Sequence, residues 1–232
     1  MNHVSRWLSA LPQEAMSFSE NPPADERNGI KATPRQGTKN TLPEILEANA
    51  AYAEKFGDKA KLTGAPRRRM AILTCMDARM DPAKFTGLSE GDSHVIRNAG
   101  GRASDDAIRS LVVSCKLMGT TDWFVIHHSG CGMQSYTDDD IRHLLGLDHE
   151  EVHPEGSKWH HVQKSAQTPA DIHWLTFSDL KQSIIDDVAR IRSHPLVPPS
   201  VAIYGYIYHI HHGTLEPVEE ANRIGAPQVE RA

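Results

Sequence analysis

The sequence predicts an α/β domain in which helices flank a mainly parallel central sheet, with a hairpin at its C-terminal end. Short apolar runs such as residues 70–74 are typical of strands that are buried on both faces of a parallel sheet. Segments with apolar residues at helical spacing alternate with these runs, which favours right-handed crossover connections. The chain of 232 residues is 39% hydrophobic, enough for one domain with a sizeable core.

The chain divides into an N-terminal arm and a single domain. Residues 1–40 combine prolines and glycines with polar residues, and they show too little apolar periodicity for a packed element. We expect this segment to be flexible, or to wrap around a neighbouring subunit. Residues 41–232 then form the α/β domain.

The domain is expected to begin with a helix and two strands. Thr41 and Glu44 form a capping-box pattern, and apolar residues at helical spacing continue to Gly57. Three arginines at 67–69 precede the first strand, and we interpret them as its solvated entry rather than as an anion site. The two strands cover residues 70–74 and 94–97.

Helices and strands continue to alternate in the rest of the domain. Ser104 is expected to cap a helix that reaches Gly119 and carries Cys115 on its buried stripe as a small core residue. Thr137 caps a short helix with three aspartates in its first turn, and Ser178 opens another that Pro195 ends. Further strands are expected over residues 123–127 and 201–208, with a short return over 214–216.

Composition excludes several classes of function. The net charge of -5 comes from 25 basic and 30 acidic residues without a long block of either sign, so nucleic acid and anionic membrane surfaces are poor partners. No run of about 18 apolar residues is present, and we expect a soluble, cytoplasmic protein. Three cysteines, an odd number, favour reduced thiols over a disulfide framework.

Three polar side chains alternate where the first strand ends. Cys75, Asp77 and Arg79 would face the same way if the chain stayed extended, and they could then share one cavity. A thiolate can bind a soft metal, a carboxylate can accept a proton, and an arginine can keep that carboxylate ionised. The triplet therefore suggests a reactive site that needs partners from elsewhere in the chain.

Those partners follow the ends of other predicted strands. The pair Gly100–Gly101 follows the second strand, His128 follows the third, and Cys131 lies three residues further on. Ligands gather beyond the carboxyl ends of parallel strands, so we expect these residues to meet Cys75 at one edge of the sheet. The glycines either offer N–H donors to a small linear substrate or only form a tight strand exit.

Two thiolates and one imidazole suit Zn²⁺. Such ligands bind zinc at about 2.3 Å for sulfur and about 2.0 Å for nitrogen, and three protein ligands leave a fourth position open for catalysis. A structural site would need a fourth cysteine or histidine nearby, whereas Cys115 is expected in the core. We therefore predict one zinc ion per subunit, bound by Cys75, His128 and Cys131.

Other histidines are expected to have ordinary roles. His127 should alternate to the sheet face opposite His128. The His209-x-His211-His212 pattern is interpreted as a solvated turn rather than a second metal site, and His160–His161 as part of a polar loop.

The two motifs together resemble a known family. Cys75-Met76-Asp77-Ala78-Arg79 and His128-Ser129-Gly130-Cys131-Gly132, with Asn98-Ala99-Gly100-Gly101 between them, are similar to the signature of the β-class carbonic anhydrases from about residue 42 onward. The resemblance implies zinc on Cys75, His128 and Cys131, and a catalytic pair of Asp77 and Arg79. It also implies a homodimer or homotetramer. The short C-terminal half is similar to a compact branch that includes hydrolases of carbonyl sulfide and carbon disulfide.

The leading function is therefore attack of zinc-bound hydroxide on a small cumulated molecule, by default hydration of CO₂ to bicarbonate. Hydrolysis of carbonyl sulfide or carbon disulfide, with release of H₂S, would use the same metal chemistry. A non-catalytic zinc or thiol-redox protein is the alternative from another class. A dinucleotide enzyme is disfavoured, because no G-x-G-x-x-G turn follows the first strand.

Overall fold

A computed structural model describes residues 41–144 and 172–228. The predicted arm over residues 1–40 and the pair His160–His161 lie outside these residues. No helix in the described ranges is both long enough and apolar enough to cross a membrane.

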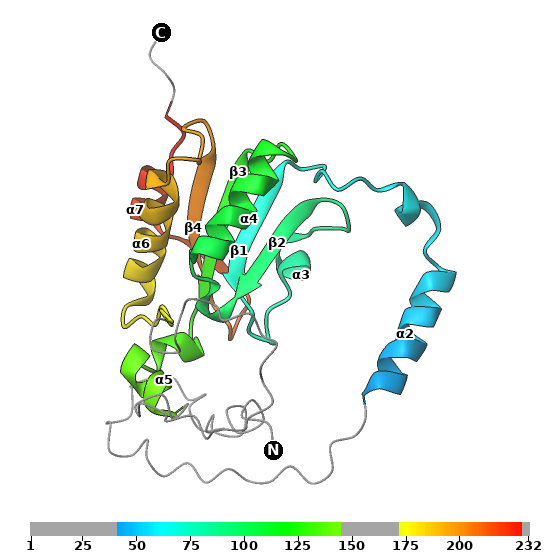
Figure 1. The fold of residues 1–232 in the computed structure, drawn as a ribbon, viewed down its shortest axis with the longest axis horizontal. Coiled ribbons are helices and arrows are strands. Elements are labelled where there is room, and N and C mark those ends of the chain that lie inside the picture. Colours follow the sequence, from blue (N-terminus) through cyan, green and yellow to red (C-terminus); the bar gives the residue numbers. More distant parts are fainter. Residues whose placement is uncertain (1–40, 145–171, 229–232) are drawn as a thin grey trace, which may run out of the picture.

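The centre of the fold is a five-stranded sheet with the order β2-β1-β3-β4-β5 (Figure 1). The first four strands are mutually parallel, and β5 pairs antiparallel with β4 as the return arm of a hairpin. The predicted fold class is confirmed. The strands are β1 Met70–Cys75, β2 Ser93–Asn98, β3 Asp122–His128, β4 Ala202–Tyr208 and β5 Leu215–Pro217.

Helices cover both faces of this sheet. The larger apolar core lies on the face covered by α4, α6 and α7, where alternate strand residues such as Leu73 and Val125 are fully buried. A second core on the other face includes Ile72 and Ile126 together with the segments around α3 and α5. The bounds are α3 Pro82–Thr86, α4 Asp105–Lys116, α5 Asp138–Leu144, α6 Leu180–Ser193 and α7 Glu219–Ile224, with 3-10 turns at Gly57–Lys61, Ala99–Gly101 and Gly132–Gln134.

Of the four predicted helix starts, two are confirmed and two are wrong in detail. The Ser104 hydroxyl accepts a bond from Ala107 N, and the Thr137 hydroxyl accepts one from Asp140 N. Thr41 precedes a helix as predicted, yet its own backbone is helical and its side chain makes no cap bond. The cap of α6 is Asp179 rather than Ser178, because the Asp179 carboxylate accepts the Gln182 N–H.

The three arginines before β1 stabilise the entry to the sheet. Arg67 and Arg68 both pair with Asp92, a buried carboxylate that also accepts the Ser89 N–H. Arg69 donates to the carbonyl of Gly119, where α4 has ended. All three arginines are exposed at the strand entry, as predicted.

Helix α2, Leu42–Glu54, buries none of its residues in this chain. Figure 1 shows it standing apart from the sheet, at the end of an extended connection. Its apolar face was predicted correctly, but that face is open: Ile45 and Leu46 are 61% and 58% exposed. An exposed apolar stripe of this kind indicates an interaction surface.

Close packing of α6 and α7 on β4 leads to a test of the core. A Cβ on Gly205 would lie 2.6 Å from Ala221 Cβ and from Ile184 Cγ2, both of which are buried. Gly205→Ala should therefore destabilise the fold by about 1–3 kcal/mol through overpacking. Urea unfolding should show a lower midpoint with an unchanged slope. Gly64→Ala, whose Cβ would meet only Met118 atoms at 4.0 Å, is the matched control, and an equal loss in both variants would contradict the packing argument.

Candidate metal centre

The strand order creates a crevice between the ends of β1 and β3. From β1 the chain moves to β2 on one side, and it then returns to place β3 on the other side of β1. Such a reversal of direction leaves an opening beyond the carboxyl ends of the two central strands. Cys75 is the last residue of β1 and His128 is the last residue of β3, so both residues lie at this opening.

Cys75, His128 and Cys131 form a buried cluster whose ligand atoms all lie within 4.8 Å of one another. Within the described ranges this is the one group of three or more such side chains arranged to hold a metal ion. The sulfurs of Cys75 and Cys131 are 3.9 Å apart, far beyond the roughly 2.05 Å of a disulfide. Two sulfurs bound tetrahedrally to zinc at about 2.3 Å would be about 3.8 Å apart.

The tautomer of His128 leaves a nitrogen available to a metal. Nδ1 lies 3.0 Å from the carbonyl oxygen of Ser129, which can only accept a bond, so Nδ1 carries the proton. Nε2 is buried and has no hydrogen-bond partner. An unpaired buried acceptor typically costs about 1–3 kcal/mol, and a coordinated metal ion would satisfy it.

Contact between the two sulfurs shifts the pKa values of Cys75 and Cys131 in opposite directions. The hydrogen bond from Cys131 and the neighbouring His128 lower the pKa of Cys75 to about 4, although burial opposes this. The same contact with Cys75, together with burial, raises the pKa of Cys131 well above its ordinary value. Burial and mutual contact oppose a second negative charge on the pair, and a divalent cation would stabilise both thiolates.

Asp77 and Arg79 lie beside the cluster as a bidentate pair. Arg79 donates from Nε to Oδ1 at 2.9 Å and from Nη2 to Oδ2 at 2.6 Å, and its backbone N–H also donates to Oδ1. Partial burial opposes ionisation of Asp77, but the bonds from Arg79 outweigh it and keep the pKa of the carboxyl below its usual value. Asp77 Oδ2 lies 3.7 Å from His128 Nε2.

The expected extended chain through Cys75, Asp77 and Arg79 is not present. The strand ends at Cys75, and the next residues form a turn closed by a bond from Met80 N to the carbonyl of Asp77. The side chains of Asp77 and Arg79 meet because the turn folds them together, and Arg79 Nη2 also donates to the carbonyl of Gly130 at 3.1 Å. The turn thus links the cysteine segment of β1 to the loop that carries Cys131.

Arg97 also shapes this turn, and the sequence did not single it out. From the end of β2, its Nε donates to the carbonyl of Cys75 at 2.9 Å and its Nη2 to that of Asp77 at 2.7 Å. One signal in the sequence could have indicated Arg97. It is a positively charged residue near the end of β2, the strand that pairs with β1. Arg79 and Arg97 both line a cavity of about 640 Å³ beside the turn, together with Ala78, Met80, Asp81, Lys84, Phe85 and Tyr208.

Gly100 and Gly101 pack against the end of β1. Both have positive φ, 80° and 70°, and a Cβ on Gly101 would lie 2.8 Å from Cys75 N and Thr74 C. Only glycine allows this approach and this backbone conformation. The pair therefore has a structural role next to the cluster, and its contact with substrate remains a prediction.

The other candidates lie away from the metal cluster. His127 faces α6 as predicted, with Nδ1 2.9 Å from the hydroxyl of Ser183. In the hairpin, His209 binds Glu216 at 2.7 Å and His212 binds Thr214, so these rings have local partners. Cys115 is partly buried against the larger core, and burial raises its pKa.

Comparison with known proteins agrees with this arrangement. The family model described as carbonic anhydrase matches residues 70–215. The chain is 33% identical over 175 residues to β-carbonic anhydrase 1 of Mycobacterium tuberculosis, covering 75% of this chain and 96% of the relative. It is 30% identical over 183 residues to a carbon disulfide hydrolase of Acidithiobacillus thiooxidans, covering 76% of this chain and 90% of the relative.

Solved structures show the same fold. A carbonic anhydrase from Streptococcus mutans superposes with a TM-score of 0.66 at 35% identity, covering 78% of this chain and 99% of the other. The apo form of a carbon disulfide hydrolase superposes with a TM-score of 0.56 at 27% identity, covering 77% and 92%. With more than half of its length matched by the family model and its sheet shared with these enzymes, the chain belongs to the β-carbonic anhydrase family.

Proposed function

We propose that this protein is a zinc enzyme that adds water to a small cumulated molecule, with hydration of CO₂ to bicarbonate as its leading reaction. The observation that supports the proposal most is the juxtaposition of two groups. The buried Cys-His-Cys cluster lies next to an ionised carboxylate, with Asp77 Oδ2 3.7 Å from His128 Nε2.

The residues present fit one zinc ion per subunit. Cys75, His128 and Cys131 supply two soft sulfurs and a nitrogen whose lone pair has no partner in the protein. When bound, zinc supplies Lewis acidity, which lets a water molecule ionise near neutral pH. Two thiolates offset the charge of the metal, so this acidification should be weaker than at a three-histidine site, and a nearby proton acceptor is needed.

Asp77 is the group that we assign as this acceptor and orienting residue. Its carboxylate can accept a hydrogen bond from the reacting water and aim the oxygen lone pair at an electrophilic carbon. Arg79 keeps the carboxylate ionised and turned toward itself through two side-chain bonds and one backbone bond. We therefore place Asp77 on Arg79, rather than on the metal, in the active state. Gly100 and Gly101 would let a small linear substrate approach the backbone closely.

A second candidate reaction is hydrolysis of carbon disulfide or carbonyl sulfide. It is supported by relatives named carbon disulfide hydrolase at 30% and 33% identity, which is similar to the 33% for β-carbonic anhydrase 1. A thiol-redox function has less support, because Cys75 and Cys131 are 4% and 1% exposed, whereas redox-active thiols need access to a reaction partner.

We also propose that the protein acts as a homo-oligomer, at least a dimer, in the cytoplasm. The apolar face of α2 is exposed in the single chain, and its burial against a partner would be favourable. A second copy of the same chain is always available as that partner. Three unpaired cysteines are consistent with a reducing compartment.

Substitution of Asp77 tests the proposed reaction. Asp77→Asn keeps the shape of the side chain but removes the proton acceptor, so turnover should fall about 10²–10⁴-fold while zinc stays near one per subunit. Stopped-flow CO₂ hydration and H₂S release from carbonyl sulfide and carbon disulfide, measured on one preparation, identify the substrate. Wild-type zinc content is measured in parallel by elemental analysis.

Asp106→Asn is the matched control, because Asp106 is an exposed residue in the first turn of α4. It should leave turnover and zinc content unchanged. Full activity in Asp77→Asn would contradict the assigned role, and wild-type protein without zinc or without turnover on all three substrates would contradict the proposed function.

The exposed face of α2 yields a test of assembly. Replacing Ile45 and Leu46 together by glutamate should convert the oligomer to a monomer, because charged residues cannot be buried without partners. The monomer itself should fold, since both residues are more than half exposed in the single chain. Light scattering coupled to size-exclusion chromatography measures the mass. Glu47→Gln, on the same helix, is the control, and an unchanged mass in the double variant would rule out α2 as the interface.

A further inference from the structure

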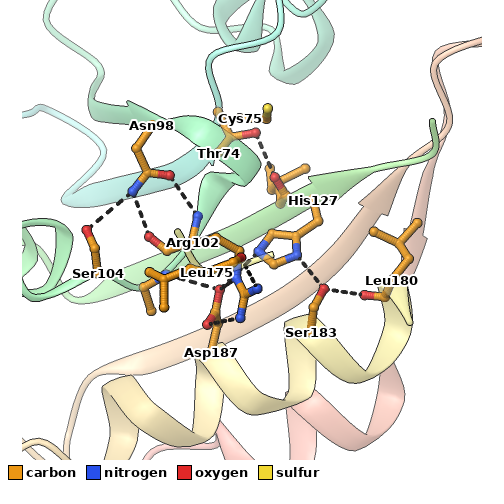
Figure 2. A network of polar contacts seen from close by, with 12 residues as sticks. Thr74, Cys75, Asn98, Arg102, Ser104, His127, Leu175, Leu180, Ser183 and Asp187 are labelled. Atoms are coloured by element: carbon orange, nitrogen blue, oxygen red, sulfur yellow. Dashed lines mark hydrogen bonds and ion pairs between the residues drawn. The ribbon is translucent and has the colours of Figure 1, made fainter. Parts of the chain in front are cut away.

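Four polar side chains are buried on the sheet face opposite the metal cluster, between the sheet and α6. Arg102, His127, Ser183 and Asp187 are each less than 10% exposed. Figure 2 shows these four side chains together, with Ser183 and Asp187 coming from the same helix. None of them was expected at a site. Asp187 occupies a position on the apolar stripe of α6, next to Val188 and one turn from Ile191, where a carboxylate is unusual.

Asp187 is the centre of this network. Arg102 donates to it from Nε at 2.8 Å and from Nη2 at 3.0 Å, and Ala103 N donates to Oδ2 at 3.0 Å. His127 Nε2 lies 3.2 Å from the same oxygen, at ion-pair distance but without the alignment of a full hydrogen bond. Burial opposes ionisation of Asp187, yet its contacts with His127 and Arg102 outweigh it and keep the pKa of the carboxyl below its ordinary value.

One branch of the network leads to Cys75. Asn98 fixes the loop after β2, because its side chain accepts from Arg102 N and donates to Arg102 O, both at 2.7 Å. Within that loop Gly101 packs so closely on β1 that a Cβ would lie 2.8 Å from Cys75 N. Asp187 holds the far end of this loop, so a shift of its carboxylate would move the backbone against which Cys75 rests.

The other branch leads to His128. The ring of His127 lies between Asp187 and Ser183, whose hydroxyl is 2.9 Å from Nδ1 and 2.8 Å from the carbonyl of Leu180. His127 directly precedes His128 in β3, and neighbouring strand residues share a rigid backbone. A fixed ring on one face of the strand therefore limits rotation of the strand end that carries the ligand on the other face.

We propose that Asp187 is a positioning residue of the metal centre. From α6 it holds the loop behind Cys75 and the strand residue before His128, and it thereby slows the loss of zinc from the site. This inference rests on the proposed zinc function. Residues that orient metal ligands without touching the metal commonly change affinity about 10–100-fold when they are replaced.

If Asp187 had a purely structural role, zinc release would depend only on the stability of the fold. If Asp187 only stabilised the fold, any substitution on the buried side of α6 that lowered the melting temperature equally would loosen the metal equally. Val188 is the adjacent residue, is fully buried and packs on β4 without joining the polar network. Val188→Ala is therefore the matched control.

The test measures zinc release from the purified, zinc-loaded full chain. Release is followed by the absorbance of a chromogenic chelator, beside the melting temperature of each variant. Asp187→Asn preserves side-chain volume but turns an amide toward donor groups of Arg102 and Ala103, and it should release zinc about 10–100-fold faster than wild type. Val188→Ala should melt lower but release zinc within about twofold of wild type.

Ser183→Ala provides a second, milder variant in case Asp187→Asn does not fold. It removes only the hydroxyl that faces His127 and leaves Asp187 and Arg102 in place, so it should accelerate release about threefold or more, by less than Asp187→Asn does. Wild-type release rates in both network variants, or equal acceleration in Val188→Ala, would overturn the inference. Failure of the wild-type chain to bind zinc would overturn the proposed function together with it, so zinc content of the wild type distinguishes the two.

Discussion

The site depends on the parallel pairing of β1 with β3. Met70 to Thr74 lie opposite Asp122 to Ile126, and Thr74 Oγ1 adds a bond to the carbonyl of Ile126 at 2.7 Å. Side chains along a strand alternate between faces, so a slip of one residue would exchange the directions of His127 and His128. The strand register therefore determines which of two adjacent histidines reaches the cysteines.

Two carboxylates near this pairing are each held by an arginine, but over very different distances along the chain. Arg79 is two residues from Asp77 and meets it through a local turn, at the half-exposed mouth of the site. Arg102 is 85 residues from Asp187 and meets it in the interior. The local pair lies within one turn, whereas the distant pair connects α6 to the loop that follows β2. One pair is therefore partly exposed beside the Cys-His-Cys cluster, and the other is buried on the opposite face of the sheet.

Much of the fold could be predicted from the sequence because its strands are short apolar runs with clear ends. The strands around Ile72, Val125 and Ile203 were placed within one or two residues, and Ser104 and Thr137 begin their helices as expected. The helices α3 and α7 have only five and six residues, too few for a periodic pattern to emerge. At Thr41 the capping motif was present but its bond was not, since local sequence does not determine the rotamer of an exposed threonine.

The candidate site was predictable to the extent that its residues follow strand ends. Cys75 and His128 do so directly, and Cys131 lies one short loop further on. Arg97 and Asp187 were missed, because their partners are backbone or side-chain groups on elements that are distant in sequence. Spacing alone cannot show such contacts. Asp187 did leave one trace, a charge on an otherwise apolar helix stripe.

The proton on His128 is oriented by the carbonyl of Ser129 rather than by a side chain. Main-chain carbonyls are present whatever residue occupies the position, so substitutions at Ser129 leave this acceptor in place. In evolutionary terms, the orientation of His128 does not depend on which residue occupies position 129. The carboxylate of Asp77, in contrast, is held by the side chain of one residue, Arg79. Sequence changes at Asp77 and Arg79 would therefore leave the orientation of the His128 ring in place.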